Sequence, residues 1–307
     1  MKKTALGLSL IGLTCITSIY GFSNVGITGP DAAPVAPHSL PWLMVMLEQD
    51  PAGNMQAACG GTLIDSLHIV TAAHCVCCTG ATPQGLPIPE SPASLTWVQS
   101  TTNAQGQVTW KNQPRLNIST ITVNPLYATI GPNPSDTGSG QNNNDVAVLT
   151  LSTPIKLSSY PTLDQGDYGM PTQTAYVAGF GARNGNDVYP YISSAAAYYV
   201  PNNIIDNAQC STYLPSTSNP TLTNEMLCGF DQPNSNGTTG GSNCIGDSGG
   251  PLFHTNTAPN EWANSNDFIL VGLVSWGGSS CGVGFPDVYT KVSAERTWIQ
   301  SVVNSNS

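Results

Sequence analysis

The sequence predicts an all-β protein made of antiparallel strands, and three observations support that class. Short runs of β-forming residues alternate with turn-forming segments along most of the 307-residue chain. Glycine (31) and proline (24) are frequent, which favours many turns over long helices. One stretch, 294–303, places apolar residues at helical spacing, and we expect it to form a single C-terminal helix.

The predicted strands are short, and polar or Gly- and Pro-rich connections separate them. Strands of this length and number pack as an antiparallel sandwich or barrel. Four of the connections, at 79–94, 131–144, 234–243 and 255–266, are long enough to form surface loops. The predicted strands cover residues 42–47, 61–64, 69–72, 95–99, 118–123, 146–151, 174–178, 196–200, 268–276 and 288–292.

The charge balance excludes two classes of partner. Lys and Arg number 8 against 18 Asp and Glu, so the net charge is -10. Nucleic acids and anionic membrane surfaces both require basic patches, and neither is expected to bind here. Hydrophobic residues make up 40% of the chain and charged residues 8%, a mixture that favours a packed core over disorder.

Residues 1–23 have the pattern of a secretory signal peptide. Lys2 and Lys3 precede an apolar run over 4–19, and the small residues Gly21 and Ser23 follow it. The run is shorter than the ~20 residues of a spanning helix, so a membrane anchor is the weaker reading. The nine cysteines fit an oxidising compartment. No anchor follows the terminal helix, so we expect free secretion and no membrane association after the signal is removed.

Three short motifs carry chemistry. His74 follows a predicted strand in Thr-Ala-Ala-His-Cys, and Asp145 precedes one in Asn-Asp-Val-Ala-Val-Leu. Ser248 lies in Gly-Asp-Ser-Gly-Gly-Pro. A serine hydroxyl becomes a nucleophile when an imidazole removes its proton, and a buried carboxylate fixes the tautomer of that imidazole. Each motif alone also fits a structural histidine, a turn cap or an ordinary glycine turn, whereas the three together in this order are specific.

With these motifs the chain resembles the trypsin/chymotrypsin-like serine proteases, from about residue 27 to the terminal helix. The segments 41–42, 59–64, 274–277 and 286–292 extend the resemblance. The family fold implies two antiparallel six-stranded β-barrels with a C-terminal helix and an active site between the barrels. We expect one protease domain over 27–307, with the crossover between barrels near 152–166.

The resemblance implies a secreted serine endopeptidase that works through an acyl-enzyme intermediate. Ser248 is expected to be the nucleophile, His74 the general base and then acid, and Asp145 its orienting partner. The backbone N–H groups of Gly246 and Ser248 are expected to form the oxyanion hole. The alternative is a non-catalytic homologue that acts as a binding protein.

The family also implies activation of an inactive precursor, or zymogen, by a cut that exposes a new N-terminus. Asp247 would pair with that α-amino group, and Ile27 in Ile-Thr-Gly-Pro is the expected first residue, although this is a degraded match. Residues 24–26 would then be a short activation peptide. In the other reading the tripeptide stays attached and Asp247 finds another partner.

Eight cysteines remain after the signal peptide is removed. The resemblance implies the disulfides Cys59–Cys75, Cys210–Cys228 and Cys244–Cys281, each worth roughly 3 kcal/mol in the chain-entropy model. Cys77 and Cys78 have no family counterpart. A bridge between them, free thiols and a reshuffled partner for Cys59 stay open; a zinc site is disfavoured because histidines are scarce.

The substrate pocket predicts a preference for Arg or Lys before the cut bond. Ser242 stands where trypsin has its aspartate, which by itself suggests chymotrypsin-like specificity. Asp287, at a second position of the pocket base, could supply the missing negative charge. Gly277 is expected to leave the entrance open, and Ser275, Trp276 and Gly277 to hold the substrate backbone as an added strand.

We expect no cofactor and no metal, because the loop after His74 holds only Glu90 as a carboxylate for a calcium site. The Gly-Phe-Gly turn at 179–181 fails as a dinucleotide site because no helix pattern follows it. The expected partners are protein or peptide substrates and protein inhibitors, with the enzyme a monomer.

Overall fold

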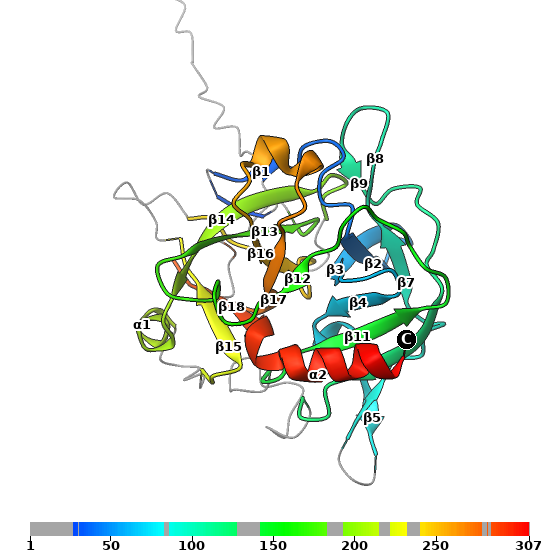
Figure 1. The fold of residues 1–307 in the computed structure, drawn as a ribbon. Helices are drawn as coiled ribbons and strands as arrows, with labels where there is room; N and C mark the ends of the chain where they lie inside the picture. The colour runs from blue at the N-terminus through cyan, green and yellow to red at the C-terminus, as the bar shows by residue number, and fades with distance from the viewer. Residues whose placement is uncertain are drawn as a thin grey trace, which may run out of the picture.

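The computed structural model describes residues 27–29, 31–82, 86–127, 142–182, 193–214, 222–231, 240–277, 281 and 284–306. Two β-sheets lie side by side, with the C-terminal helix beneath both (Figure 1). The expected signal peptide, residues 1–23, and the expected activation peptide, residues 24–26, lie outside the described residues.

The first sheet has six antiparallel strands in the order β10-β11-β4-β3-β2-β7. Apolar and β-branched residues fill its central strands, and every residue of β4 and β11 is buried. The strands are β2 (Leu43–Gln49), β3 (Met55–Leu63), β4 (His68–Thr71), β7 (Thr96–Gln99), β10 (Ile118–Val123) and β11 (Ala147–Leu151).

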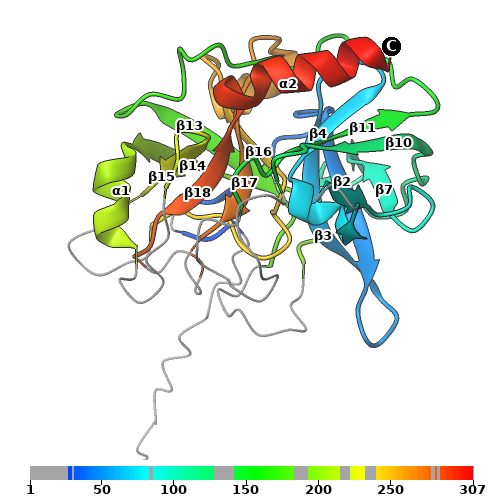
Figure 2. The same cartoon turned by 90° about the horizontal axis from the view of Figure 1, so that it is seen from below.

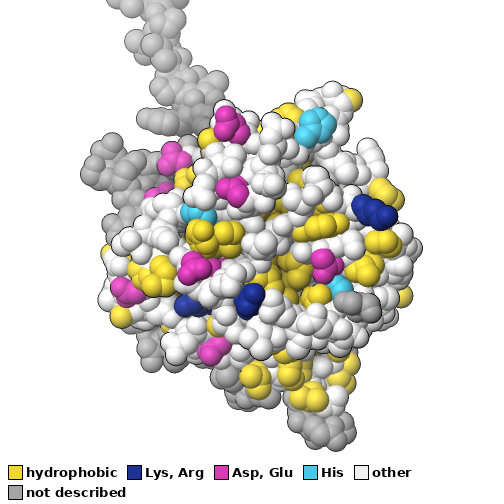
Figure 3. All heavy atoms as spheres, in the orientation of Figure 1, with side chains coloured by type: hydrophobic (Ala, Val, Ile, Leu, Met, Phe, Trp, Pro, Cys, Tyr) yellow, Lys and Arg dark blue, Asp and Glu magenta, His cyan; other side chains and the backbone are white. Residues whose placement is uncertain are grey.

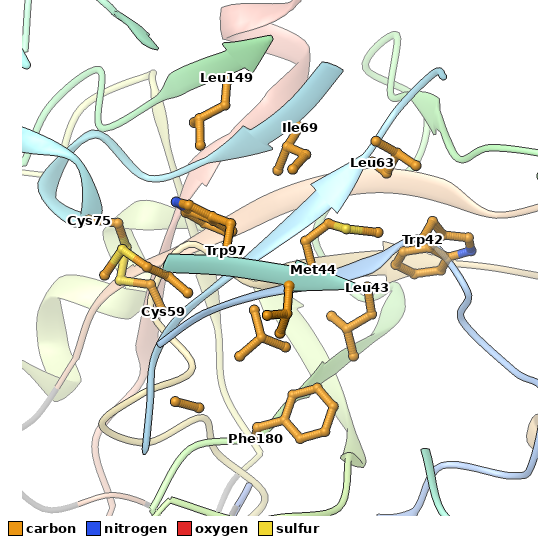
Figure 4. Packing of buried hydrophobic residues seen from close by; sticks show 14 of the residues in the cluster. Trp42, Leu43, Met44, Cys59, Leu63, Ile69, Cys75, Trp97, Leu149 and Phe180 are labelled. Atoms are coloured by element: carbon orange, nitrogen blue, oxygen red, sulfur yellow. A yellow bond between two sulfur atoms is a disulfide. The ribbon is translucent and has the colours of Figure 1, made fainter. Parts of the chain in front are cut away.

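The largest hydrophobic core lies inside this sheet and extends to the second one. Figure 4 shows Trp97 and Ile69 facing the same interior, with the Cys59–Cys75 disulfide at one end. Trp42 packs edge-on against Phe253 of strand β16 (Pro251–His254) in the second sheet, with ring centroids 5.4 Å apart. The core therefore fixes the position of one sheet against the other.

The second sheet has six main strands in the order β14-β13-β16-β17-β18-β15 and closes because β14 also pairs with β15. Its short additions are β1 (Ala33–Pro34), antiparallel to β14, and β12 (Thr162–Leu163), parallel to β17. The main strands are β13 (Thr174–Gly179), β14 (Tyr198–Ile205), β15 (Met226–Gly229), β16 (Pro251–His254), β17 (Ile269–Trp276) and β18 (Asp287–Lys291). The predicted all-β fold of two six-stranded antiparallel sheets with a C-terminal helix is confirmed; the second sheet is a closed barrel, whereas the first is a half-barrel in the described residues, because no pairing joins β10 to β7.

Helix α2 (Val292–Ser305) crosses the base of both sheets (Figure 2). Its Ile299 is fully buried in a cluster with Val148 of β11 and Leu273 of β17. The predicted helix, 294–303, falls inside the observed one. No helix of the described residues is long and apolar enough to span a membrane.

Several short elements were not predicted because they are too brief for a periodic pattern. Helix α1 (Asn207–Tyr213) begins where the Asp206 carboxylate accepts a hydrogen bond from the Gln209 N–H. The others are η1 (Ala73–Cys75), β5 (Cys77–Ala81), β6 (Pro87–Pro89), β8 (Thr101–Thr102), β9 (Val108–Thr109) and η2 (Pro259–Asn264).

Candidate active site

The pairing of β4 with β11 brings His74 and Asp145 together. Thr71 pairs with Ala147 across these antiparallel strands. His74 follows β4 by three positions along η1, and Asp145 precedes β11 by two, so both fall at the same end of the sheet. Two residues 71 positions apart in the sequence thereby become neighbours.

Two hydrogen bonds join the pair. His74 Nδ1 lies 2.8 Å from Asp145 Oδ2, and the His74 backbone N–H donates to Asp145 Oδ1 at 2.9 Å. The Asp145 side chain is fully buried, whereas 27% of the His74 side chain is exposed. The contact of Nδ1 with a carboxylate places the proton on Nδ1 and leaves Nε2 to accept one.

The Asp145 carboxylate also accepts a hydrogen bond from the Ser275 hydroxyl at 2.5 Å, and its backbone carbonyl accepts one from Thr290 at 2.8 Å. Both donors belong to the second sheet, so Asp145 is held from both sheets at once. The pKa of His74 reflects this carboxylate: burial lowers the pKa, but the charge and hydrogen bond of Asp145 outweigh burial and raise it overall. The site therefore stabilises the imidazolium that forms when Nε2 accepts a proton.

Ser248 lies in a tight loop anchored to both sheets. Its carbonyl accepts from the Gly60 N–H at 2.7 Å, and the Gly249 N–H donates to the Val274 carbonyl at 2.7 Å. Gly249 has a φ of +71°, and a Cβ there would lie 2.2 Å from the Thr71 hydroxyl oxygen. Glycine is therefore required at this position for the loop to approach the end of β4.

The backbone N–H groups of Gly246 and Ser248 are not used by any hydrogen bond among the described residues. The N–H groups of Asp247, Gly249 and Gly250 are all used internally. Two free donors on either side of Asp247 have the character of an oxyanion-binding site.

No hydrogen bond joins the Ser248 hydroxyl to His74 within the described part of the chain. The two loops nevertheless meet, since Cys75 Sγ lies 3.5 Å from the Ser248 carbonyl oxygen. Such bonds are often long before substrate binds and tighten in the complex.

A cavity of about 140 Å³ opens beside Ser248. All five residues that the sequence analysis assigned to the substrate pocket line it: Ser242, Ser275, Trp276, Gly277 and Asp287. Phe285, Val274 and Ile245 add apolar walls. Asp287 is the one charged residue among the described residues of the lining.

Asp287 is buried in this lining, with 5% of its surface exposed. Its Oδ1 accepts from the Ser242 hydroxyl at 2.8 Å, and its Oδ2 from the Asn243 N–H at 3.1 Å and from Asn202 Nδ2 at 3.2 Å. Burial raises the pKa of Asp287 to about 7, although these hydrogen bonds oppose the shift. No cation pairs with Asp287 among the described residues.

Asp247 and Ile27 lie on the second sheet's side of the site. Asp247 is fully buried and accepts from the N–H groups of Gly181 at 2.8 Å and Cys244 at 2.9 Å. Burial raises its pKa to about 6. Ile27 is fully buried, and Thr28 pairs through its backbone with Ser242. In the full chain the nitrogen of Ile27 is a peptide nitrogen, and no hydrogen bond among the described residues joins it to Asp247.

The cysteines form four bridges in the described residues: Cys59–Cys75, Cys77–Cys78, Cys210–Cys228 and Cys244–Cys281. Of the three states left open for Cys77 and Cys78, the structure has the bridge between neighbours. Cys59, His74 and Cys75 form a group with metal-ligand spacing, but both sulfurs belong to a disulfide and offer no thiolate.

Sequence reasoning missed Asn202 and Tyr289, which lie behind the pocket base. The Asn202 amide and the Tyr289 hydroxyl both contact Asp287. A signal for Asn202 was present, because it shares the inward register of β14 with Val200 and Ile204. The predicted strand ended at 200, before Pro201, and so excluded it.

Two sheets with the site between them define the class of β-barrel proteases, and comparison with known proteins gives the family. The model of the family described as Trypsin matches residues 31–299. The chain belongs to the trypsin family of serine proteases, which implies protein substrates.

Three curated relatives are similar over 86% of this chain. Phenoloxidase-activating factor 3 of Holotrichia diomphalia is 28% identical, with 69% of its length covered. Fibrinolytic enzyme, isozyme C of Lumbricus rubellus is 27% identical, with 95% covered. Melanization protease 1 of Drosophila melanogaster is 30% identical, with 63% covered.

Proposed function

We propose that this protein is a serine endopeptidase that cuts peptide bonds through Ser248, His74 and Asp145. The observation that carries the proposal is the buried Asp145 carboxylate on His74 Nδ1, which leaves Nε2 to accept a proton. Nε2 lies 3.8 Å from Cys75 Sγ, which in turn lies 3.5 Å from the Ser248 carbonyl oxygen. That arrangement has the parts of a nucleophile, a base and an orienting group.

In the proposed reaction His74 Nε2 takes the proton of the Ser248 hydroxyl as its oxygen attacks the scissile carbonyl carbon. The carbonyl oxygen becomes an oxyanion, which the N–H groups of Gly246 and Ser248 stabilise by roughly 3 kcal/mol per donor. The imidazolium then gives its proton to the leaving amine, and an acyl-enzyme forms. Water, deprotonated by His74, releases the acid product and regenerates Ser248.

We further propose that the pocket prefers Arg or Lys before the cut bond. A buried carboxylate without a cationic partner favours a cation from the substrate, and the apolar walls of the pocket suit the methylene stem of a basic side chain. The alternative is chymotrypsin-like specificity, in which the donors around Asp287 satisfy it and apolar side chains enter the pocket.

The mature enzyme is proposed to begin at Ile27 and to be secreted. A cut after residue 26 would turn the buried Ile27 nitrogen into an α-amino group, and Asp247 is a buried carboxylate that needs such a partner. The proposed segments are a signal peptide over 1–23, an activation peptide over 24–26 and a protease domain over 27–307. The resemblance suggests a monomer that protein inhibitors can block.

The test is cleavage of a peptide library by protein beginning at Ile27, beside a matched Ser248→Ala variant. Cleavage by the first alone, reduced by several orders of magnitude in the variant, supports the mechanism. Cuts after Phe, Tyr or Leu would leave the mechanism intact and refute the basic preference.

The second candidate is a non-catalytic homologue, favoured by the absence of a Ser248–His74 hydrogen bond and by the degraded start at Ile27. It predicts no cleavage by either protein.

A further inference from the structure

Asn202 is a polar side chain in a place where a strand buries apolar ones. It lies on β14 between Val200 and Ile204, on the inward side, and only 1% of its surface is exposed. Gly229 of β15 leaves room for it, because a Cβ at that position would lie 2.8 Å from the amide carbon and oxygen of Asn202. The amide is thus packed flat against the neighbouring strand.

The hydrogen bonds of this amide all go to the base of the pocket. Nδ2 donates to Asp287 Oδ2 at 3.2 Å and to the Tyr289 hydroxyl at 2.9 Å. Its Oδ1 is buried without a hydrogen-bond partner among the described residues. A buried oxygen without a hydrogen bond costs free energy, so an apolar side chain would stabilise this strand better than an amide does. The amide therefore contributes little to the stability of the fold.

We propose that Asn202 is a positioning residue that sets the preference for the residue before the cut bond, by holding the Asp287 carboxylate ionised and aimed into the cavity. This inference rests on the proposed function of the pocket. Asn202 itself would not touch the substrate, but it would control the charge and orientation of Asp287, which does.

Two contacts carry the effect. The first is the direct donation to Asp287 Oδ2, which favours the charged carboxylate over the neutral acid. The second runs through Tyr289: its hydroxyl accepts from Asn202 at 2.9 Å and from Asn243 at 3.2 Å. With both acceptor positions occupied, the hydroxyl proton is left to point at Asp287 Oδ2, 3.4 Å away.

The other donors do not replace these contacts. The Ser242 hydroxyl has a second acceptor, the Asn243 carbonyl at 2.9 Å, so its single proton is shared between two oxygens. The Asn243 N–H makes one bond, at 3.1 Å, to the same Oδ2. Without Asn202, Asp287 keeps fewer donors in an environment that already disfavours its charge.

The experiment uses Asn202→Leu and Asn202→Ala in the mature protein, with Asn203→Ala as the control on the exposed face of the same strand. Leucine has nearly the size and shape of asparagine but cannot form hydrogen bonds. Alanine is smaller, so it removes the same hydrogen bonds without any steric clash. The measurements are kcat and KM for two peptides that differ only in Arg or Leu before the cut bond, together with the melting temperature.

At an assay pH below 7, we expect the Arg-over-Leu ratio of kcat/KM to fall about tenfold in both Asn202 variants, the factor that corresponds to a rise of one unit in the pKa of Asp287. The change should be a rise in KM for the Arg peptide. The value of kcat/KM for the Leu peptide and the melting temperature of Asn202→Leu should stay the same. An unchanged ratio in both variants, or an equal fall for both peptides, would overturn the inference.

A parallel Asp287→Asn variant separates this inference from the proposed pocket specificity. If Asp287→Asn removes the Arg preference and the Asn202 variants keep it, the inference alone is wrong. If the unmodified enzyme has no Arg preference, the specificity proposal is wrong, and this inference is refuted with it.

Discussion

The affinity of the pocket for a small cation should depend on pH through Asp287. Burial raises the pKa of this carboxyl from 3.8 to about 7, so the free pocket is neutral in mild acid and negative above neutrality. Tyr289, the titratable side chain in contact with it, has a pKa raised well above 10.0 and stays protonated throughout. An amidinium such as benzamidine carries one positive charge and should bind the ionised form.

The size of the effect follows from proton competition. Below a pKa of about 7, binding of the cation must displace one proton, so the dissociation constant rises about tenfold for each pH unit. Between pH 8 and pH 5 the total weakening should be about 100-fold. We would measure benzamidine binding by calorimetry with Ser248→Ala, so that the result does not depend on catalysis.

The control is the same measurement with Asp287→Asn added. The double variant should bind weakly at every pH and show no slope. A flat profile in Ser248→Ala, or an equal slope in both proteins, would refute the assignment of the charge to Asp287.

The unfolding free energy of the protein without a bound cation should fall as the pH rises, whereas its affinity for the cation should increase. The folded pKa of Asp287 is above the unfolded value, so its protonation stabilises the fold fully below about pH 4, and this contribution is lost as the pH rises through about 7. The loss is on the order of 4 kcal/mol at most.

Two further predictions concern the support of the site. Glu295 on α2 is buried and accepts hydrogen bonds from Asn144, directly before Asp145, at 2.7 Å and from Asn124 at 2.8 Å. Glu295→Ala should lower the unfolding free energy by about 1–3 kcal/mol and should also lower kcat, whereas Gln300→Ala on the exposed face should change neither. Urea unfolding and peptide kinetics would test this. Asp247 has a pKa raised to about 6, so the uncut precursor should lose stability as the pH rises through that value. A cut before Ile27 should remove this loss of stability. Thermal melts of both forms from acid to mild alkali would check this, and identical pH profiles would contradict it.

Much of the fold could be predicted because each long strand has a local pattern. All ten predicted strands overlap an observed one, and the run at 118–123 coincides with β10. Strands β15 and β16 were missed although they are as long as the predicted β4 and β7, because β16 begins with a proline and β15 ends with a glycine, two residues that are unfavourable in strands. Their identity as strands depends on partners far away in the sequence, which no local window contains.

The residues nearest to the chemistry could be chosen because they lie next to predicted strands, in glycine-rich or strand-end motifs. The residues that hydrogen-bond to these groups from behind could not be predicted. Asn202 reaches Asp287 across 85 positions of sequence, and Asn124 reaches Glu295 across 171. Such pairs depend on how one strand or helix is placed against another, and periodicity carries no information about that.

Most charged side chains of the described residues lie at the surface, but several carboxylates lie in the interior. Figure 3 shows one face that is mostly uncharged, with scattered acidic and few basic side chains. Asp145, Asp247, Asp287 and Glu295 are all buried. Burying these carboxylates costs free energy, because they leave water. Packing elsewhere in the protein, including the aromatic contacts around Trp42 and Trp262, offsets that cost.

The position of α2 has a consequence for the order of assembly during synthesis. Its buried side chains leave the ribosome after every strand of both sheets, and they join the first sheet to the second. A growing chain can pair the strands of its first sheet early, but until α2 emerges it lacks one of the two hydrophobic clusters that join the sheets. We expect a nascent chain to hold its two sheets together less firmly until residues 292–305 emerge, which happens only after every strand of both sheets has been made.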